Sequence, residues 1–314
     1  MRAPETVKLM FQTPEILFNN EFVMTLKKTL VACLAALSGS LVHASPTFVF
    51  TAIPDQDETR LKERFAKVSA YLETQLKTDV RFVPVKSYAA AITAFRNNQV
   101  QLAWFGGLSG VKARQLVPGA QAIAQGVEDP NFKSYFIAHN STGLTDNADA
   151  TSTTLPADIQ GKTFTFGSKG STSGRLMPEF YLRQQFNQAP DETFSRVGFS
   201  GNHSRTIALV ETGAYQLGAV NYKVWDSSVA AGTVDTSKVK VIGETPAYPD
   251  YQWTVRGDLD SQFGEGFTAK VKQALLDMKD PDLLNSFPRK GFIPATNADF
   301  KPILEVGKQV GLID

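Results

Sequence analysis

Short strand-like segments alternate with helix-like segments from residue 47 onward, and this alternation limits the possible folds more than any other feature of the chain. Phe48–Ile53, Val80–Val85 and Val100–Phe105 are predicted strands, because they are short, apolar and rich in valine and phenylalanine. Between the first two, apolar side chains recur at helical spacing from Leu61 to Leu76. Such a β-α-β-α succession predicts a mostly parallel sheet flanked by helices.

A second alternating block begins after the polar stretch 145–154. Two α/β units of roughly 100 residues each predict an α/β protein with two lobes and a ligand cleft between them. The extended segments Ser134–His139 and Gln252–Arg256 are candidates for the strands that cross between the lobes. The other predicted elements are strands over Thr163–Gly167, Arg196–Phe199 and Leu217–Val220, and helices over Leu176–Phe186, Thr206–Glu211, Phe263–Met278 and Phe300–Val310.

The N-terminal region contains the pattern of a secretory signal peptide. Two lysines at 27–28 precede an apolar run over 30–41, and small residues follow up to Ala44. The run is too short to span a bilayer, which takes roughly 20 apolar residues in a helix. We therefore expect cleavage after Ala44 and a periplasmic mature protein, with translation starting at Met24 and residues 1–23 an upstream extension.

Cys33 is the only cysteine of the chain. Leu30–Cys33 resembles a lipoprotein cleavage box, but only four residues separate Cys33 from Lys28, which disfavours lipid attachment. Cleavage after Ala44 leaves no cysteine for thiol catalysis, disulfides or thiolate metal sites. Residues 1–44 hold four of the 32 basic and three of the 31 acidic side chains, so the mature chain has no net formal charge. Nothing in this balance favours nucleic acid or a membrane surface as a partner.

A loop rich in glycine and hydroxyl groups, residues 167–175, lies between a predicted strand and a predicted helix. The free N–H groups and the dipole of a helix N-terminus attract anions, and small hydroxylated residues add O–H donors. The spacing is not that of a Walker A loop, and a capped helix start without a ligand is the simpler alternative. Because Pro178 interrupts a regular helix, we expect a tight turn here and a helix beginning near Met177.

Two further turns follow predicted strands, Trp104–Ser109 with Gly106 and Gly107, and Gly198–Ser204 with His203. Ligands of α/β sheets gather at the carboxyl ends of strands, so three such turns would form a donor-rich pocket. A simple tight turn and a structural histidine are the alternatives. No metal site is expected at His203, because no cysteine or second histidine lies near it in the sequence. The sequence also lacks the G-x-S-x-G motif that would indicate a serine hydrolase. The sequence therefore predicts a binding protein without a metal or other cofactor.

Four segments follow one another along the chain: Tyr88–Ile92, Ala103–Ser109, Ser171–Gly174 with Pro178, and Gly201–His203. In this order they resemble the periplasmic phosphate/phosphite/phosphonate-type binding proteins of ABC importers, and the resemblance covers essentially residues 45–314. Two further segments, Thr51–Glu58 and Val85–Tyr88, are most similar to the branch named for selenate binding.

The resemblance implies a two-lobed type II binding-protein fold in which the second lobe is inserted between the halves of the first. We place lobe 1 at residues 45–138 and 250–314, and lobe 2 at 139–249. The implied function is that of the substrate-binding component of an ABC importer, a monomer that closes on its ligand and docks on a membrane permease served by an ATPase. A periplasmic sensor that feeds a histidine kinase is the alternative.

The resemblance also implies a site for a small tetrahedral oxyanion. The backbone and hydroxyls of Ser171, Thr172 and Ser173 would hold the anion. Tyr88 and His203 would donate further hydrogen bonds from opposite sides of the cleft, and the Gly106–Gly107 turn would border the site.

Two other positions bear on which oxyanion binds. Phe132 stands where the phosphonate branch usually has a tyrosine, and Asp250 matches an acidic position that serves the amine of an aminophosphonate. Sulfate and selenate carry no proton at neutral pH, so a carboxylate repels them, whereas phosphite, phosphate and phosphonates can offer an O–H or an ammonium group. Asp250 therefore argues against selenate, the branch resemblance argues for it, and both ligand classes stay open.

Overall fold

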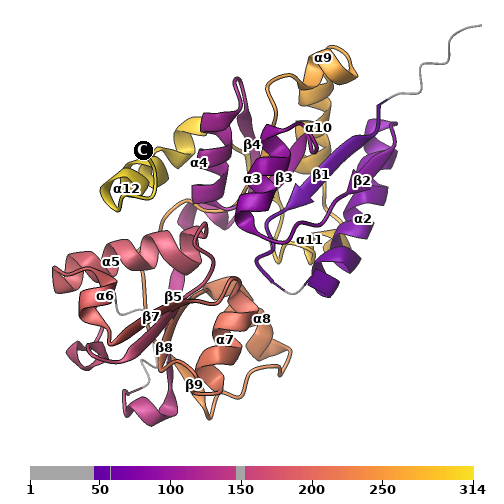
Figure 1. The fold of residues 1–314 in the computed structure, drawn as a ribbon. Coiled ribbons are helices and arrows are strands. Elements are labelled where there is room, and N and C mark those ends of the chain that lie inside the picture. Colours follow the sequence, from indigo (N-terminus) through magenta and orange to yellow (C-terminus); the bar gives the residue numbers. More distant parts are fainter. Residues whose placement is uncertain (1–45, 57, 146–152) are drawn as a thin grey trace, which may run out of the picture. The chain divides into compact units, whose positions relative to one another are not determined.

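The computed structural model of the chain describes residues 46–56, 58–145 and 153–314, which belong to one compact unit and contain two separate β-sheets (Figure 1). The signal peptide, the start at Met24 and the lipidation question at Cys33 lie outside the described residues and stay predictions. Within the described part of the chain, no helix combines the length and the apolarity needed to cross a membrane.

The first sheet consists of β1 (Phe48–Ala52), β2 (Val80–Phe82), β3 (Leu102–Phe105), β4 (Gln121–Gly126), β10 (Gln252–Val255) and β11 (Phe292–Pro294). The strand order is β11-β4-β10-β3-β1-β2. β1 pairs in parallel with β2 and β3, as the alternation of strands and helices predicted. β10 lies antiparallel between β3 and β4, and β11 is antiparallel to β4. The predicted mostly parallel sheet is therefore wrong in this respect, because strands from the C-terminal segment join the sheet antiparallel and make it mixed.

The second sheet consists of β5 (Ser134–His139), β6 (Thr163–Phe166), β7 (Arg196–Phe199), β8 (Leu217–Asn221) and β9 (Val239–Glu244). Its order is β7-β6-β8-β5-β9, with β6 parallel to β7 and β8 and with β5 antiparallel to β8 and β9. The two segments predicted to cross between the lobes are both strands, but the crossing role is wrong, because each pairs in one sheet only. β5 pairs within the second sheet, and β10 pairs within the first.

Helices from both ends of the described chain accompany the first sheet, as the indigo and yellow ribbons of Figure 1 show. α10 contacts α2, and α12 contacts α4, so the C-terminal segment completes the part of the protein that the N-terminal segment begins. These helices are α2 (Glu58–Leu76), α3 (Tyr88–Arg96), α4 (Gly107–Leu116), α9 (Leu259–Phe263), α10 (Phe267–Leu276), α11 (Pro281–Leu284) and α12 (Lys301–Gln309).

Helices cover both faces of the second sheet. Phe136 and Ile137 are neighbours on β5 and point to opposite faces, so they belong to two different apolar clusters. Leu182 of α5 packs in the first of these clusters and Ile207 of α7 in the second. The helices of this part are α5 (Met177–Phe186), α6 (Pro190–Thr193), α7 (His203–Glu211) and α8 (Tyr222–Ala230).

One predicted helix is wrong in its extent. The segment Phe263–Met278 begins at the last residue of α9 and contains α10, because Gly264 and Gly266 adopt positive φ angles of 102° and 79° that a regular helix does not allow. A polar turn of three residues therefore separates apolar positions that looked continuous at helical spacing.

Candidate functional site

The turn after β6 forms a compact loop, residues 167–176, that its own backbone holds closed. The Gly167 N–H donates to the Gly174 carbonyl at 2.7 Å, and the Ser171 hydroxyl accepts from the Gly174 N–H at 2.9 Å. A Cβ at Gly174 would lie 3.0 Å from both the Ser171 Oγ and the His203 Cε1. Glycine at this position therefore lets the loop approach the histidine of a neighbouring segment.

A π-helical turn, Thr172–Leu176, connects this loop to α5, and its last N–H donates to the Ser171 carbonyl at 3.0 Å. Pro178 explains the wide turn. It lacks the N–H that would bond the Gly174 carbonyl in a regular α-helix, so this carbonyl is free to close the loop. α5 begins at Met177, which confirms the predicted start of the helix.

The first N–H groups of α4 are occupied by side chains from other segments. The Gly107 N–H donates to Asp250 Oδ1 at 2.8 Å, and the Leu108 N–H donates to Thr172 Oγ1 at 3.0 Å. A Cβ at Gly106 would lie 3.1 Å from Asp250 Oδ1 and 3.2 Å from Thr172 Oγ1. The turn at Gly106–Gly107 thus joins three segments that are distant in the sequence, and the Gly107 N–H is already bound in this arrangement.

His203 is fully buried at the start of α7. Its Nδ1 accepts the backbone N–H of Asn221 at 3.3 Å, and its Nε2 lies 3.5 Å from the Ser173 hydroxyl. Burial lowers the pKa of His203 to about 3, so the ring is neutral at physiological pH. Because Nδ1 accepts a hydrogen bond, the single ring proton is on Nε2, which makes Nε2 a donor.

Tyr88 is buried at the start of α3, where the Ser87 hydroxyl caps the helix through the Ala90 N–H. Within the described part of the chain the Tyr88 hydroxyl has no hydrogen-bond partner. Burial first, and then the charge of Asp55, raise its pKa well above the ordinary value. Ser171 lies near enough to offset part of this rise, although it makes no hydrogen bond of normal geometry with the phenol. Tyr88 is therefore a neutral donor.

Asp250 is almost completely buried and is bonded through one oxygen only. Oδ1 accepts from Gly107, whereas Oδ2 has no partner among the described residues. Burial raises the pKa of Asp250 to about 7, against the opposing hydrogen bonds from Gly107 and Thr172, and Asp129 adds to the rise. The carboxyl group can therefore gain or lose a proton close to neutral pH.

Basic side chains near the loop are engaged with other groups. Arg175 forms an ion pair with Glu179, and its guanidinium lies 4.6 Å from the centre of the Phe199 ring. The Lys169 ammonium group lies 5.1 Å from the same ring.

Phe132 stands where the phosphonate branch usually has a tyrosine. It is fully buried against other aromatic rings and brings no hydroxyl group.

Sequence reasoning missed a second polar group of residues close to Asp250. Arg289 donates to both carboxylate oxygens of Asp129, at 2.9 and 2.7 Å, and both side chains are buried. The Tyr251 hydroxyl donates to Asp55 Oδ2 at 2.9 Å and accepts from Asn221 at 3.0 Å. These partners lie 160, 196 and 30 positions apart, so no local pattern in the sequence could have indicated them.

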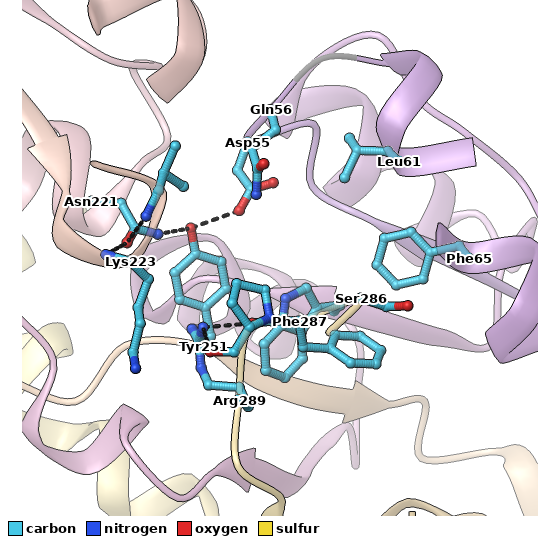
Figure 2. A pocket seen from close by; sticks show the side chains of 13 residues that line it. Asp55, Gln56, Leu61, Phe65, Asn221, Lys223, Tyr251, Ser286, Phe287 and Arg289 are labelled. Carbon is cyan, nitrogen blue, oxygen red and sulfur yellow. Dashed lines mark hydrogen bonds between the residues drawn. The ribbon is translucent and has the colours of Figure 1, made fainter. Parts of the chain in front are cut away.

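Figure 2 shows four of these residues around a small cavity. Asp55, Asn221, Tyr251 and Arg289 line it, and its volume of about 20 Å³ is room for roughly one water molecule. None of the predicted oxyanion-binding residues lines this cavity. It is therefore a small polar space beside the group formed by Tyr88, Asp250 and the 167–176 loop.

Residues 50–300 match the family described as ABC transporter, phosphonate, periplasmic substrate-binding protein. The chain belongs to this family. PhnD1 of Prochlorococcus marinus (strain MIT 9301), a probable ABC transporter phosphite binding protein, is 39% identical over 267 residues, which cover 83% of this chain and 89% of PhnD1. The phosphonates-binding periplasmic protein of Escherichia coli (strain K12) is 26% identical over 203 residues, which cover 64% of this chain and 58% of that protein.

Solved structures agree with this assignment. The structure of Prochlorococcus marinus PhnD1 in complex with methylphosphonate has a TM-score of 0.79 at 39% identity, and the match covers 85% of this chain and 99% of that one. A binding-protein component of an ABC phosphonate transporter from Pseudomonas aeruginosa has a TM-score of 0.72 at 20% identity, with 83% and 85% covered, and supports the fold alone. The predicted α/β, two-lobed binding-protein fold is confirmed.

Family membership also decides the class of function. The protein is the periplasmic substrate-binding component of an ABC transporter, and not an enzyme. The sensor alternative is not favoured, because the relatives named above are transporter components. The resemblance to the selenate-binding branch stays a prediction.

Proposed function

We propose that this protein captures a small phosphorus oxyanion that carries an O–H group, such as phosphite or methylphosphonate, and delivers it for import. The observation that carries the proposal is the unpartnered, buried Oδ2 of Asp250. A buried carboxylate oxygen without a hydrogen bond is costly, and a ligand hydroxyl would supply the missing donor.

The remaining groups of the proposed site are donors. They are the unpartnered Tyr88 hydroxyl, the His203 Nε2–H, and the hydroxyls of Ser171 and Ser173. The Thr172 hydroxyl is already bonded to the Leu108 N–H and to Asp250 in this arrangement. The Ser171 oxygen already accepts from Gly174, so its proton is free to donate. One acceptor among several donors suits a tetrahedral anion with one protonated oxygen.

The position of one proton distinguishes the candidate ligands. A phosphorus oxyanion with a second pKa of about 6, like that of a phosphate monoester, is mostly deprotonated in water at pH 8, but it is basic enough to bind one proton in the complex beside the buried carboxylate. Such a ligand can donate to an ionised Asp250. Sulfate and selenate have no proton, so they would require Asp250 itself to be protonated, which becomes unfavourable above its pKa of about 7.

The relatives support the same ligand class. PhnD1 of Prochlorococcus marinus is named for phosphite, and its solved complex contains methylphosphonate. That chain and this one are 39% identical, which supports phosphite or a small phosphonate over selenate as the ligand here.

Isothermal titration of residues 45–314 at pH 8 tests the proposal. The ligands are phosphite, methylphosphonate, 2-aminoethylphosphonate, phosphate, sulfate and selenate. We expect the tightest binding for phosphite or methylphosphonate and at least about tenfold weaker binding for sulfate and selenate, since a missing donor to a buried acceptor costs about 1–3 kcal/mol. Equal or tighter binding of selenate would overturn the assignment of ligand class.

We also propose the mature form and its partners. Export would remove residues 1–44, and the monomer would present its closed form to a membrane permease and an ATPase. The expected boundary at 138/139 would move to just before β5, because β5 pairs with β8 and β9 of the second sheet. Lobe 1 would then comprise residues 45–133 and 250–314, and lobe 2 residues 134–249. Mass spectrometry of the exported protein tests the start at Ser45, and light scattering with and without ligand tests the monomer.

A further inference from the structure

A hydrogen-bonded chain of three buried side chains connects the two sheets beside the candidate site (Figure 2). Asp55 follows β1 and Tyr251 precedes β10, so both lie at ends of strands of the first sheet. Asn221 is the last residue of β8 in the second sheet. The Asn221 amide donates to the Tyr251 hydroxyl at 3.0 Å, and this hydroxyl donates to Asp55 Oδ2 at 2.9 Å.

Residues in and next to the first sheet hold the Tyr251 hydroxyl in place. Its proton points to the Asp55 carboxylate, which leaves a lone pair for the Asn221 amide. The Tyr251 ring stacks on Trp104 with centroids 5.5 Å apart and an angle of 26° between the planes. Asp55 and Trp104 therefore orient the Tyr251 oxygen that accepts from Asn221, without any contribution from the second sheet.

Asn221 connects this acceptor to the oxyanion-binding group. Its side-chain oxygen caps α8 through the Lys223 and Val224 N–H groups, and its backbone N–H bonds His203 Nδ1 at 3.3 Å. The His203 backbone N–H in turn donates to the Asp55 carbonyl at 2.9 Å. Asp55 and Asn221 thus bond both Tyr251 and His203, the histidine that the proposed function uses as a donor.

We propose that the Asn221–Tyr251 hydrogen bond is a closure latch that sets how long the ligand stays bound. This inference rests on the proposed function, because it concerns capture at that same site. When the lobes separate, Asn221 loses the tyrosine hydroxyl, which keeps its bond to Asp55. The bond is therefore a contact of the closed state alone, and only such differential contacts shift the equilibrium towards closure.

The test compares Tyr251→Phe with Tyr71→Phe in residues 45–314. Both changes remove one tyrosine hydroxyl, and the Tyr71 hydroxyl donates to the Ala274 carbonyl within the first lobe, away from the second sheet. Stopped-flow measurement with methylphosphonate should give about tenfold faster dissociation for Tyr251→Phe, with an unchanged association rate, because a buried hydrogen bond contributes about 1 kcal/mol or somewhat more. Tyr71→Phe should dissociate as the wild type does.

Asn221→Ser completes a double-mutant cycle. Serine keeps the helix cap and the backbone N–H to His203, but is too short to reach Tyr251. We expect the double variant to dissociate no faster than Tyr251→Phe alone, because both changes remove the same bond. Multiplicative effects of the two changes, or dissociation of Tyr251→Phe at the wild-type rate, would overturn the latch.

A labelled protein separates failure of the latch from failure of the proposed ligand. The mature chain has no cysteine, so fluorophores can be placed at Glu73→Cys and Asp191→Cys, two exposed positions on α2 and α6. If the wild type binds no phosphorus oxyanion, the proposed function fails. The latch still predicts that closed-state dwell times in single-molecule energy transfer are longer in the wild type than in Tyr251→Phe, and equal dwell times would refute it.

Discussion

The backbone N–H of Asn221 donates to Nδ1 of His203, and this bond decides which ring nitrogen can donate to a ligand. A buried histidine with a pKa of about 3 is neutral, so only one of its nitrogens carries a proton. With Nδ1 used as the acceptor, Nε2 is the donor, and it points towards the Ser173 hydroxyl. The second sheet therefore orients a neutral donor at the loop that carries the serine and threonine hydroxyls.

Replacement of His203 tests this orientation. His203→Phe keeps the ring volume but removes the donor, and we expect affinity for phosphite or methylphosphonate to fall by about 1.5–3 kcal/mol, the range for hydrogen bonds to charged groups. His203→Gln places an amide N–H near the position of Nε2 and should retain most of the affinity. Titration calorimetry gives the affinities, and ¹⁵N spectra of the wild-type ring should show the Nε2–H tautomer between pH 5 and pH 8. A protonated ring in that range would contradict the assignment.

Asp250→Asn should change which anions bind. The amide keeps an oxygen for the Gly107 N–H and presents an N–H where Oδ2 was, so a ligand without a proton would find a donor instead of a carboxylate. We expect sulfate or selenate affinity at pH 8 to rise at least about tenfold, and the preference for phosphite to shrink by a similar factor. Asp258→Asn, at a partly exposed carboxylate paired with Arg256, is the matched control and should leave the ligand order unchanged.

Asp250 should also make the ligand-free protein less stable as pH rises. Its pKa is about 7 in the folded protein against an ordinary 3.8, so between these values the folded state holds a proton that the unfolded state has lost. Stability therefore falls as pH rises from about 4 to about 7 and stays lower above it. His203, with a pKa of about 3, shifts stability in the opposite direction over part of this range, so the test is the difference between two proteins. From pH 5 to pH 8 in denaturant unfolding, the wild type should lose stability relative to Asp250→Asn. Parallel pH dependence in both proteins would place the pKa of Asp250 near its ordinary value.

Breaking the buried ion pair of Arg289 and Asp129 should destabilise the protein far more than breaking a surface pair. Arg289→Met leaves the carboxylate of Asp129 buried without its partner, and we expect a loss of about 3–5 kcal/mol of stability in denaturant unfolding. Adding Asp129→Asn should recover part of this loss, because no charge is then left unpaired. Lys238→Met, in an exposed pair with Asp235, is the control and should cost less than about 1 kcal/mol.

The sequence alone was enough for features that depend on neighbours along the chain. The alternation of strands and helices predicted the α/β class, and Pro178 predicted the start of α5 at Met177. The hydroxyl-rich loop was recognised as a candidate anion site because small side chains, glycines and a helix start are all local properties. The break between α9 and α10 was missed, since it depends on the positive φ angles of Gly264 and Gly266 rather than on hydrophobic spacing.

Only the tertiary structure decided the state of each polar group. Asp250 meets Gly107 across 143 positions of sequence, and Arg289 meets Asp129 across 160. Burial by these distant segments raises the pKa of Asp250 and lowers that of His203, and a single sequence contains no measure of burial. Residue types and local spacing can be read from the chain itself. Cross-lobe contacts depend on which distant segments meet, and the protonation state and tautomer of a buried group depend on how those segments exclude water from it.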